Sequence, residues 1–193
     1  MNNSPQEYLA FANKLADAAG ITSMEYFRTS LSIDSKSDES PVTIADQNTE
    51  LKIRSMIEKE YPDHGILGEE FDSVNPDAEF IWVIDPIDGT RSYIAGHKDF
   101  GNLISLTQNK KPIIGIINCP AHDERWVGVR NQNSTVNQKI VKTSNVTEIE
   151  DAYIFTSGLY FEEPQLRNAV DKIKNKVRYF RYGGDCYMYG MVA

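Results

Sequence analysis

The sequence predicts a protein of the layered α/β class, and three observations support this prediction. Two amphipathic helical segments come first, a series of apolar strand-like segments follows, and a strand-helix-strand order comes after residue 145. Of the 193 residues, 40% are hydrophobic and 25% are charged, so the chain can bury a core. This length fits one large domain, or one complete domain and part of a second.

The first helix is expected from Ser4 to about Arg28, because a serine followed by Pro5 is a typical helix start and apolar residues then recur at helical spacing. The segment 29–42 is rich in Ser, Asp and Lys, which predicts an exposed, mobile loop. A second helix is expected from Thr43 to Lys59. It stops before Pro62, because the residue that precedes a proline disfavours helix.

The rest of the chain alternates between strand and turn patterns. Turn residues separate five apolar strand-like segments, which are 65–68, 80–85, 103–107, 112–118 and 125–129. Segment 131–138 is predicted to be a polar turn. We therefore expect a mostly antiparallel sheet behind the two helices.

A second unit is expected to begin near residue 145. A strand at Ala152–Thr156, a helix at Pro164–Asn175 and a strand at Lys176–Phe180 form a β-α-β order, and Gly184–Ala193 is typical of the start of another helix. We thus predict an N-terminal α+β domain over 1–145 and the start of an incomplete C-terminal α/β domain over 146–193.

Charge and composition limit the classes of function. The net charge of −8 argues against non-specific nucleic-acid binding, which needs a basic face. No apolar run approaches the roughly 20 residues of a membrane span, and the N-terminus lacks the apolar core of a signal peptide. Cys119 and Cys186 match no metal or redox spacing. We expect a protein of the cytoplasm with no membrane or nucleic-acid partner.

The most informative segment joins a buried strand to two carboxylates. Phe80-Ile-Trp-Val-Ile runs directly into Asp85-Pro-Ile-Asp88-Gly89-Thr90. Carboxylates at the end of a buried strand are costly to desolvate unless a positive group pairs with them. Gly89 permits a tight turn, Thr90 can cap the helix that follows, and their backbone N–H groups favour an anion. Hard oxygen ligands beside an anion site favour Mg²⁺ and phosphate.

A second acidic segment strengthens this interpretation. An Asp-x-x-Asp-Gly sequence alone is often only a turn with a helix cap, and adjacent acidic residues are usually a solvated surface. However, Gly68-Glu69-Glu70 also follows a short strand, sixteen residues before Asp85. If the two strands are neighbours, Glu69 and Asp85 meet at the same sheet edge. The histidines, His64, His97 and His122, are scattered and are interpreted as surface or turn residues.

Taken together, Gly68-Glu69-Glu70 and Trp82-Val-Ile-Asp85-Pro-Ile-Asp88-Gly-Thr90 resemble the first signature of the inositol monophosphatase superfamily. The resemblance implies an αβαβα sandwich like that of inositol monophosphatases and fructose bisphosphatases. It also implies two or three Mg²⁺ ions, a homodimer, and metal ligation by Glu69, Asp85, the carbonyl of Ile87, and Asp88.

The resemblance further assigns catalytic and phosphate-binding roles. It implies phosphate binding by Asp88, Gly89 and Thr90, and a water nucleophile polarised near Glu69, Thr90 and Asp46. The family's T-x-x-D pattern is matched by Thr43-Ile-Ala-Asp46 at the start of the second helix. The alternative for Asp46 is a first-turn acid that the helix dipole favours.

Several segments are similar to the histidinol-phosphatase branch of this superfamily. They are Arg91-Ser-Tyr93, Phe100-Gly-Asn-Leu, Glu124-Arg125-Trp126 and Arg181-Tyr-Gly-Gly-Asp185-Cys. A carboxylate at Asp185 suits the ammonium group of histidinol phosphate, although a helix cap or first-turn acid is the alternative. Arg91 and Arg181 are candidate substrate contacts. The alternative for Arg181 is a role between subunits or at the surface. The alternative for residues 124–126 is structural packing at the start of a strand.

The expected function is hydrolysis of a small phosphomonoester, L-histidinol phosphate, in histidine biosynthesis. The alternatives are an inositol-1-phosphate or nucleotide 3'-phosphatase of the same fold, or a non-catalytic relative that binds metal or a partner. The family's C-terminal Trp/Tyr-Asp motif has no counterpart up to residue 193, so we expect the sequence to be a fragment whose C-terminal part is missing.

Overall fold

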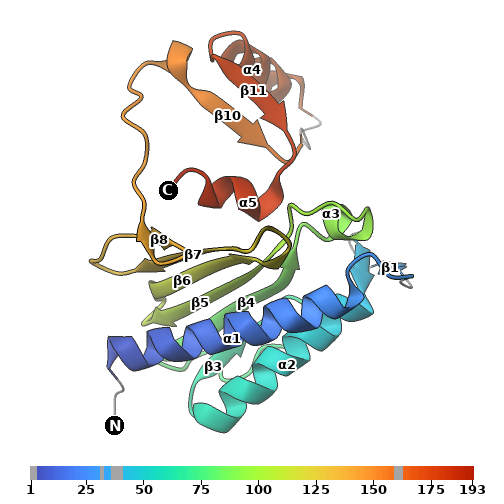
Figure 1. The fold of residues 1–193 in the computed structure, drawn as a ribbon, viewed down its shortest axis with the longest axis vertical. Coiled ribbons are helices and arrows are strands. Elements are labelled where there is room, and N and C mark those ends of the chain that lie inside the picture. Colours follow the sequence, from blue (N-terminus) through green and yellow to red (C-terminus); the bar gives the residue numbers. More distant parts are fainter. Residues whose placement is uncertain (1–3, 31–32, 36–40, 159–162) are drawn as a thin grey trace.

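The fold is seen in a computed structural model that describes residues 4–30, 33–35, 41–158 and 163–193. Five layers follow one another in Figure 1. They are a pair of helices (5–26 and 44–60), the large sheet (65–140), a short helix (185–190), a small sheet (153–156 with 179–182) and an outer helix (164–174). This order confirms the predicted αβαβα sandwich. The division into domains near residue 145 stays a prediction.

The central layer is a mixed sheet with the strand order β3-β4-β5-β6-β7-β8-β9 in the described part of the chain. The strands are β3 (Gly65–Leu67), β4 (Phe80–Asp88), β5 (Gly101–Gln108), β6 (Lys111–Cys119), β7 (Glu124–Val129), β8 (Thr135–Val136) and β9 (Lys139–Ile140). Only β3 and β4 pair in parallel, and the other neighbours are antiparallel, as the sequence predicts.

Two helices cover one face of this sheet, namely α1 (Pro5–Tyr26) and α2 (Ile44–Glu60). Each begins with a capping box, in which Ser4 or Thr43 exchanges hydrogen bonds with the acid three residues later. Small residues of α1 such as Ala12, Ala16 and Ala19 are fully buried, which lets the helix approach the sheet closely. The main core lies between these helices and the strands.

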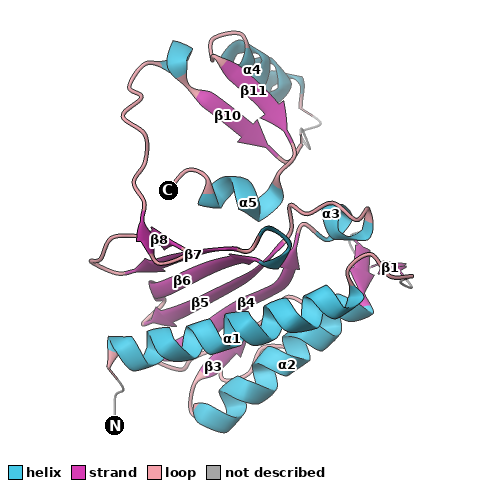
Figure 2. Cartoon of the chain, viewed as in Figure 1, coloured by secondary structure: helices cyan, strands magenta, loops and turns pink. Residues whose placement is uncertain are grey.

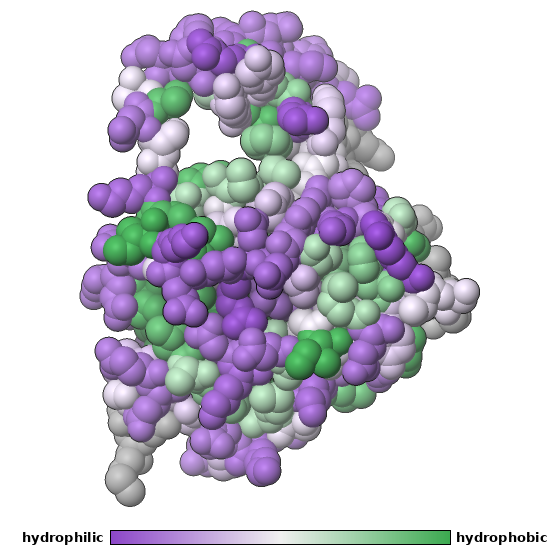
Figure 3. Space-filling view, in the orientation of Figure 1, coloured by the Kyte–Doolittle hydropathy of each residue, from purple (hydrophilic) through white to green (hydrophobic). Residues whose placement is uncertain are grey.

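The other face of the sheet carries α5 (Asp185–Gly190), and beyond it lie β10 (Tyr153–Thr156), α4 (Pro164–Lys174) and β11 (Tyr179–Tyr182). The strands β10 and β11 pair in parallel, and α4 connects them along the chain, so the predicted β-α-β order is confirmed. Figure 3 shows hydrophilic residues over the outer surface near α4 and hydrophobic residues beside the opening between this unit and the sheet. No helix in the described ranges has the length and apolar character needed to cross a membrane.

Four local predictions are wrong. Within 29–42, β1 (Ile33–Ser35) and β2 (Pro41–Thr43) form an antiparallel pair, while 31–32 and 36–40 lie outside the described residues. The predicted turn 131–138 contains β8, because the hairpin it forms with β9 extends the sheet. Strand β11 begins three residues later than predicted, at Tyr179, because 175–178 finish the turn after α4. The strand predicted at 80–85 extends to Asp88 through a β-bulge.

His64 lies in the turn after α2, which is one of the two interpretations that the sequence left open, and its side chain is half-buried. Its ring stacks on Tyr61, with ring centres 4.6 Å apart, and on Phe80, at 5.1 Å. Its Nδ1 accepts a hydrogen bond from the indole N–H of Trp82, at 3.1 Å. Burial lowers the pKa of His64 below its ordinary value, against an opposing effect of Asp63 and Glu79.

We expect the stability of the protein to fall as the pH drops below about 6.5, the pKa of an unfolded histidine. The folded pKa of His64 is the lower one, so its contribution is complete above the unfolded pKa and is lost as the pH falls through the folded pKa. The variant His64→Gln can still accept from Trp82 but does not titrate, so its melting temperature should change less between pH 7.5 and pH 5. His97 is exposed, so His97→Gln is the matched control. Its melting temperature should change between pH 7.5 and pH 5 as much as that of the wild type. The same change in melting temperature between the two pH values for all three proteins would contradict the role of His64.

Candidate active site

The candidate site lies where β4 ends, at the edge of the sheet next to α3 (Thr90–Ile94) and the start of α5. Leu67 at the end of β3 pairs with Val83 of the parallel strand β4, so Glu69 and Asp85 each come two residues after this pair. The condition set by the sequence is therefore met, because the two acidic segments do follow neighbouring strands.

A β-bulge shapes the end of β4. The register with β5 shifts between Asp85, which faces Leu103, and Asp88, which faces Gly101. Pro86 and Ile87 therefore lie outside the regular ladder, and the Pro86 carbonyl needs another partner. The side chain of Asn102 supplies it, because its Nδ2 donates to this carbonyl at 2.7 Å.

Asn102 belongs to a buried polar chain that reaches the surface. Asn118 donates to Asn102 at 2.9 Å, and Arg125 donates to Asn118 at 2.9 Å and to Asp17 at 2.6 Å. The chain is hydrogen-bonded at each step, which is how buried polar groups are tolerated. The segment Glu124-Arg125-Trp126 thus has a packing and hydrogen-bonding role, which was one of its two interpretations.

The turn after β4 is tight, and it brings Thr90 to Asp46. Gly89 has a φ of 82° and is the N-cap of α3, with no side-chain cap, so Thr90 is not the cap that the sequence predicts. The hydroxyl of Thr90 instead donates to the carbonyl of Ile87 at 3.1 Å and lies 3.5 Å from Oδ1 of Asp46. Asp46 is almost fully buried, and its Oδ2 accepts from the N–H and the hydroxyl of Thr43. Both interpretations of Asp46 are thus compatible, since one oxygen caps α2 and the other faces Thr90.

Asp88 joins the site to α5. Its Oδ2 accepts the backbone N–H of Cys186 at 2.7 Å. Burial raises the pKa of Asp88, and the negative charges of Asp185 and Glu69 raise it further, while the bond from Cys186 acts in the opposite direction. The negative charges of Asp185 and Glu69 near the buried carboxyl group of Asp88 form an environment that favours a cation.

Asp185 lies directly against the Gly89 turn. A Cβ added to Gly89 would lie 2.9 Å from Oδ2 of Asp185, and Ser92 donates to the same oxygen at 2.5 Å. The N-cap of α5 is Gly184, without a side-chain cap, so Asp185 is a first-turn acid and not the cap. Arg91 and Arg181 line one cavity of about 640 Å³ together with Ser92, Asp99 and Gly184.

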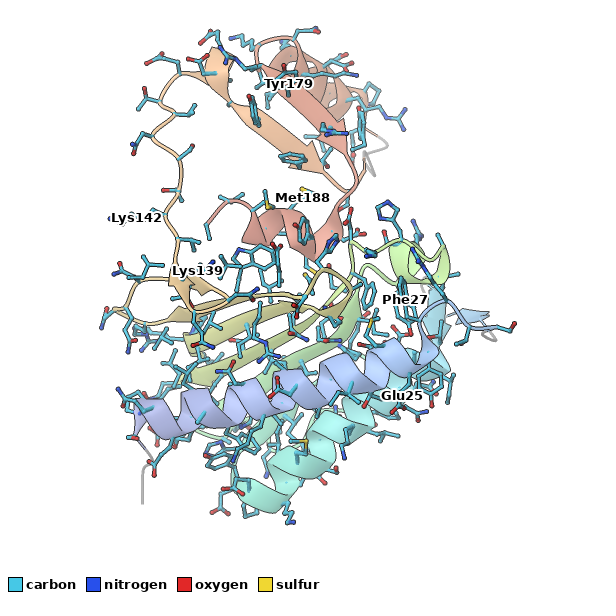
Figure 4. The ribbon with its side chains drawn as sticks, in the orientation of Figure 1. Glu25, Phe27, Lys139, Lys142, Tyr179 and Met188 are labelled. Carbon is cyan, nitrogen blue, oxygen red and sulfur yellow. The ribbon has the colours of Figure 1, made fainter. Side chains whose placement is uncertain are left out.

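The aromatic residues behind this turn fix α3 in place. Phe27, labelled in Figure 4 at the end of α1, packs on Tyr93, with ring centres 5.5 Å apart, and on Phe100, at 5.0 Å. The hydroxyl of Tyr93 donates to the carbonyl of Ser23 at 2.7 Å. The turn that holds Gly89 and Thr90 therefore rests on a buried cluster and not on a free loop.

The chemistry of these residues fits a hard cation, although their side chains do not form a complete set of metal ligands in the described part of the chain. Glu69, Asp85, Asp88 and the Ile87 carbonyl offer only oxygen atoms, the ligands that Mg²⁺ prefers. In the parts of the chain that the structure describes, no three His, Cys, Asp or Glu side chains are already gathered as a metal-binding group. Sequence analysis missed the hydrogen-bonding roles of Ser92 and Asn102 and the backbone N–H of Cys186, because these roles depend on contacts across the fold.

Carboxylates at a strand end, beside a glycine turn and a buried aspartate, offer the oxygen ligands that a hard divalent cation prefers. The family model of the inositol monophosphatase family matches residues 4–193. The chain belongs to this family.

Three similar proteins illustrate the relationship. A bifunctional chloroplastic phosphatase of Arabidopsis thaliana is 38% identical over 202 residues, which cover 100% of this chain and 58% of that protein. A histidinol-phosphatase of Chlorobaculum parvum is 38% identical, over 96% of this chain and 72% of its own. The solved structure of an inositol monophosphatase from Zymomonas mobilis has a TM-score of 0.86 and 40% identity, over 99% of this chain and 74% of its own. The chain thus spans about three fifths of the Arabidopsis protein.

Proposed function

We propose that the protein hydrolyses a small phosphomonoester with the help of Mg²⁺, and that the substrate is L-histidinol phosphate, an ester of histidine biosynthesis. The observation that carries the proposal is that Glu69 follows β3 while Asp85 and Asp88 end the neighbouring strand β4, beside the Gly89 turn. The phosphatase names of the similar proteins support the hydrolytic activity.

The metal would be held by Glu69, Asp85, the Ile87 carbonyl and Asp88, with places for two or three ions. When bound, Mg²⁺ supplies charge neutralisation at the phosphate and lowers the pKa of a water. The raised pKa of Asp88 supports this assignment, because a cation would relieve the repulsion from Glu69 and Asp185.

The residues of the chain orient the nucleophile and the phosphate. Thr90 can donate its proton to Asp46, at 3.5 Å, so that its oxygen accepts a proton from the attacking water. Glu69 comes to the same water from the other acidic segment. The backbone N–H groups of Gly89 and Thr90 bind the phosphate in this proposal, as the family resemblance implies.

Substrate choice rests on Asp185, with Arg91 and Arg181 as further contacts. The carboxylate of Asp185 lies against the phosphate turn, where it can pair with the ammonium group of histidinol phosphate. The 38% identity to a protein named histidinol-phosphatase supports this choice. An inositol phosphate offers only hydroxyl groups, which would leave the charge of Asp185 without a counter-ion.

Hydrolysis of inositol phosphate is the second candidate, and the 40% identity to a solved inositol monophosphatase favours it. The family resemblance underlies our proposal of a homodimer, and the N-terminus without a signal-peptide core underlies our proposal of a cytoplasmic location. The free thiols of Cys119 and Cys186 suit a reducing compartment.

A substrate panel tests the proposed function. We expect the full-length protein with Mg²⁺ to hydrolyse histidinol phosphate with the highest kcat/KM, ahead of inositol 1-phosphate and 3'-phosphoadenosine phosphate, by at least about tenfold. Chelation with EDTA should abolish the reaction, and added Mg²⁺ should restore it. A preference for inositol 1-phosphate would overturn the substrate, and the absence of hydrolysis of all three esters would favour a non-catalytic relative.

A further inference from the structure

The helix α2 carries two buried charged residues to which the proposed chemistry assigns no role. Glu50 is fully buried and Arg54 is 6% exposed, and they form an ion pair with 2.7 Å between Nε of Arg54 and Oε1 of Glu50. Charges of this kind are rarely buried unless they are paired and hydrogen-bonded, so their other contacts indicate what they do.

Those contacts all lie in one short segment. The other carboxylate oxygen of Glu50, Oε2, accepts the backbone N–H groups of Glu69, at 3.0 Å, and Glu70, at 2.8 Å. Nη2 of Arg54 donates to the carbonyl of Phe71 at 2.9 Å, and the guanidinium lies over the Phe71 ring. Three consecutive residues of the loop after β3 are thus fixed by two side chains of α2.

Asp46 belongs to the same row of α2. Asp46, Glu50 and Arg54 follow at intervals of four residues, which places them on one face of the helix. At one end of the row Asp46 faces Thr90, and in the middle Glu50 holds the backbone of Glu69. A single rigid helix therefore sets the spacing between the Thr90 turn and the Glu69 loop.

Gly68 shows how closely the carboxylate of Glu50 approaches this loop. A Cβ added to Gly68 would lie 1.9 Å from Oε1 of Glu50 and 2.8 Å from Nη2 of Arg54. A side chain at this position would therefore displace the ends of the Glu50 and Arg54 side chains. The absence of a side chain at Gly68 thus leaves room for the carboxylate of Glu50, which accepts the backbone N–H of the next residue, Glu69.

We propose that Glu50 and Arg54 are positioning residues that hold Glu69 at the metal site, so that they set the affinity of the protein for Mg²⁺. The inference rests on the proposed function, in which Glu69 is a metal ligand. Groups that orient a ligand through a hydrogen bond commonly change metal affinity when they are removed, and here the bonds go to the ligand's own backbone.

Magnesium titration by calorimetry on the full-length protein, without substrate, tests the inference. Two variants break the contact in different ways. Glu50→Gln removes the charge, and Gly68→Ala displaces the carboxylate of Glu50 while Glu50 itself is kept. The matched control is Gly115→Ala, at a glycine of β6 with nothing within 4 Å of the added Cβ. We expect both variants to weaken the Kd for Mg²⁺ about tenfold, and the control to leave it unchanged.

The melting temperature in EDTA separates positioning from general stability. A purely structural role would lower the metal-free melting temperature of Glu50→Gln or Gly68→Ala and leave the Kd of the folded protein at the wild-type value, and this result would overturn the inference. If Glu50→Gln does not fold, the Kd of Gly68→Ala decides in the same way. Wild-type protein that binds no Mg²⁺ would refute the proposed function instead, so the two failures are distinguishable.

Discussion

Replacing Asp85 by asparagine is expected to lower magnesium-dependent kcat/KM by about a thousandfold or more, while the protein still folds. Such a loss corresponds to roughly 4 kcal/mol of transition-state stabilisation, at about 1.4 kcal/mol for each factor of ten. The reason is the position of Asp85, at the end of β4 and next to the strand β3 that leads to Glu69. In the proposed site its carboxylate is a metal ligand, and an amide carries no negative charge to replace it.

The stability of the same variant separates a metal ligand from a structural residue. One oxygen of the Asp85 carboxylate is buried, and burying an ionised carboxylate costs free energy when no cation is present. We therefore expect Asp85→Asn to melt at the wild-type temperature or above it in EDTA, and to lose the stabilisation that added Mg²⁺ gives the wild type.

The control for this variant is Asp123→Asn, an exposed residue directly after the short 3-10 helix η1 (Pro120–His122), with a φ of 56°, a conformation that asparagine tolerates. It should keep full activity and the wild-type response to Mg²⁺. Full activity of Asp85→Asn would remove Asp85 from the mechanism. A large drop of its melting temperature in EDTA would show instead that the carboxylate supports the fold.

Local patterns in the sequence predicted most of the fold. The helix starts at Ser4 and Thr43 are capping boxes, and such signals are legible over a few residues. The hairpin of β8 and β9 and the pair of β1 and β2 were not predicted, because strands of two or three residues are too short to show a strand pattern. Pairing with a neighbouring strand, and not strand propensity, decides such segments.

The site shows the same limit. The acids Glu69, Asp85 and Asp88 stand in a recognisable order along the chain, so they could be proposed from the sequence. The Asn102 bond to Pro86 depends on a β-bulge, which no local pattern announces. Glu50 did leave a signal, because it lies at helical spacing from Ile53 and Ile57, on the buried face of α2. A charged residue at such a position predicts a buried partner.

Asp185→Asn is expected to change the choice of substrate more than the fold. If the carboxylate pairs with the ammonium group of histidinol phosphate, the loss of one charge-assisted hydrogen bond costs about 1.5–3 kcal/mol. This corresponds to roughly a ten- to hundredfold lower kcat/KM on histidinol phosphate. An ester of a neutral alcohol, such as inositol 1-phosphate, makes no such pair and should lose much less.

The surroundings of Asp185 make asparagine a clean replacement. The amide oxygen can still accept from Ser92, which donates to Oδ2 in the wild type at 2.5 Å, and asparagine tolerates the φ of 39° at this position. Gly184 is the N-cap of α5, so no side-chain cap is lost. Removing the charge also lowers the pKa of Asp88, which Asp185 helps to raise, but that change affects every substrate alike. The ratio of kcat/KM between the two esters therefore isolates the pairing with the ammonium group. Equal losses on both esters would refute this role of Asp185 and leave inositol phosphate as the favoured substrate.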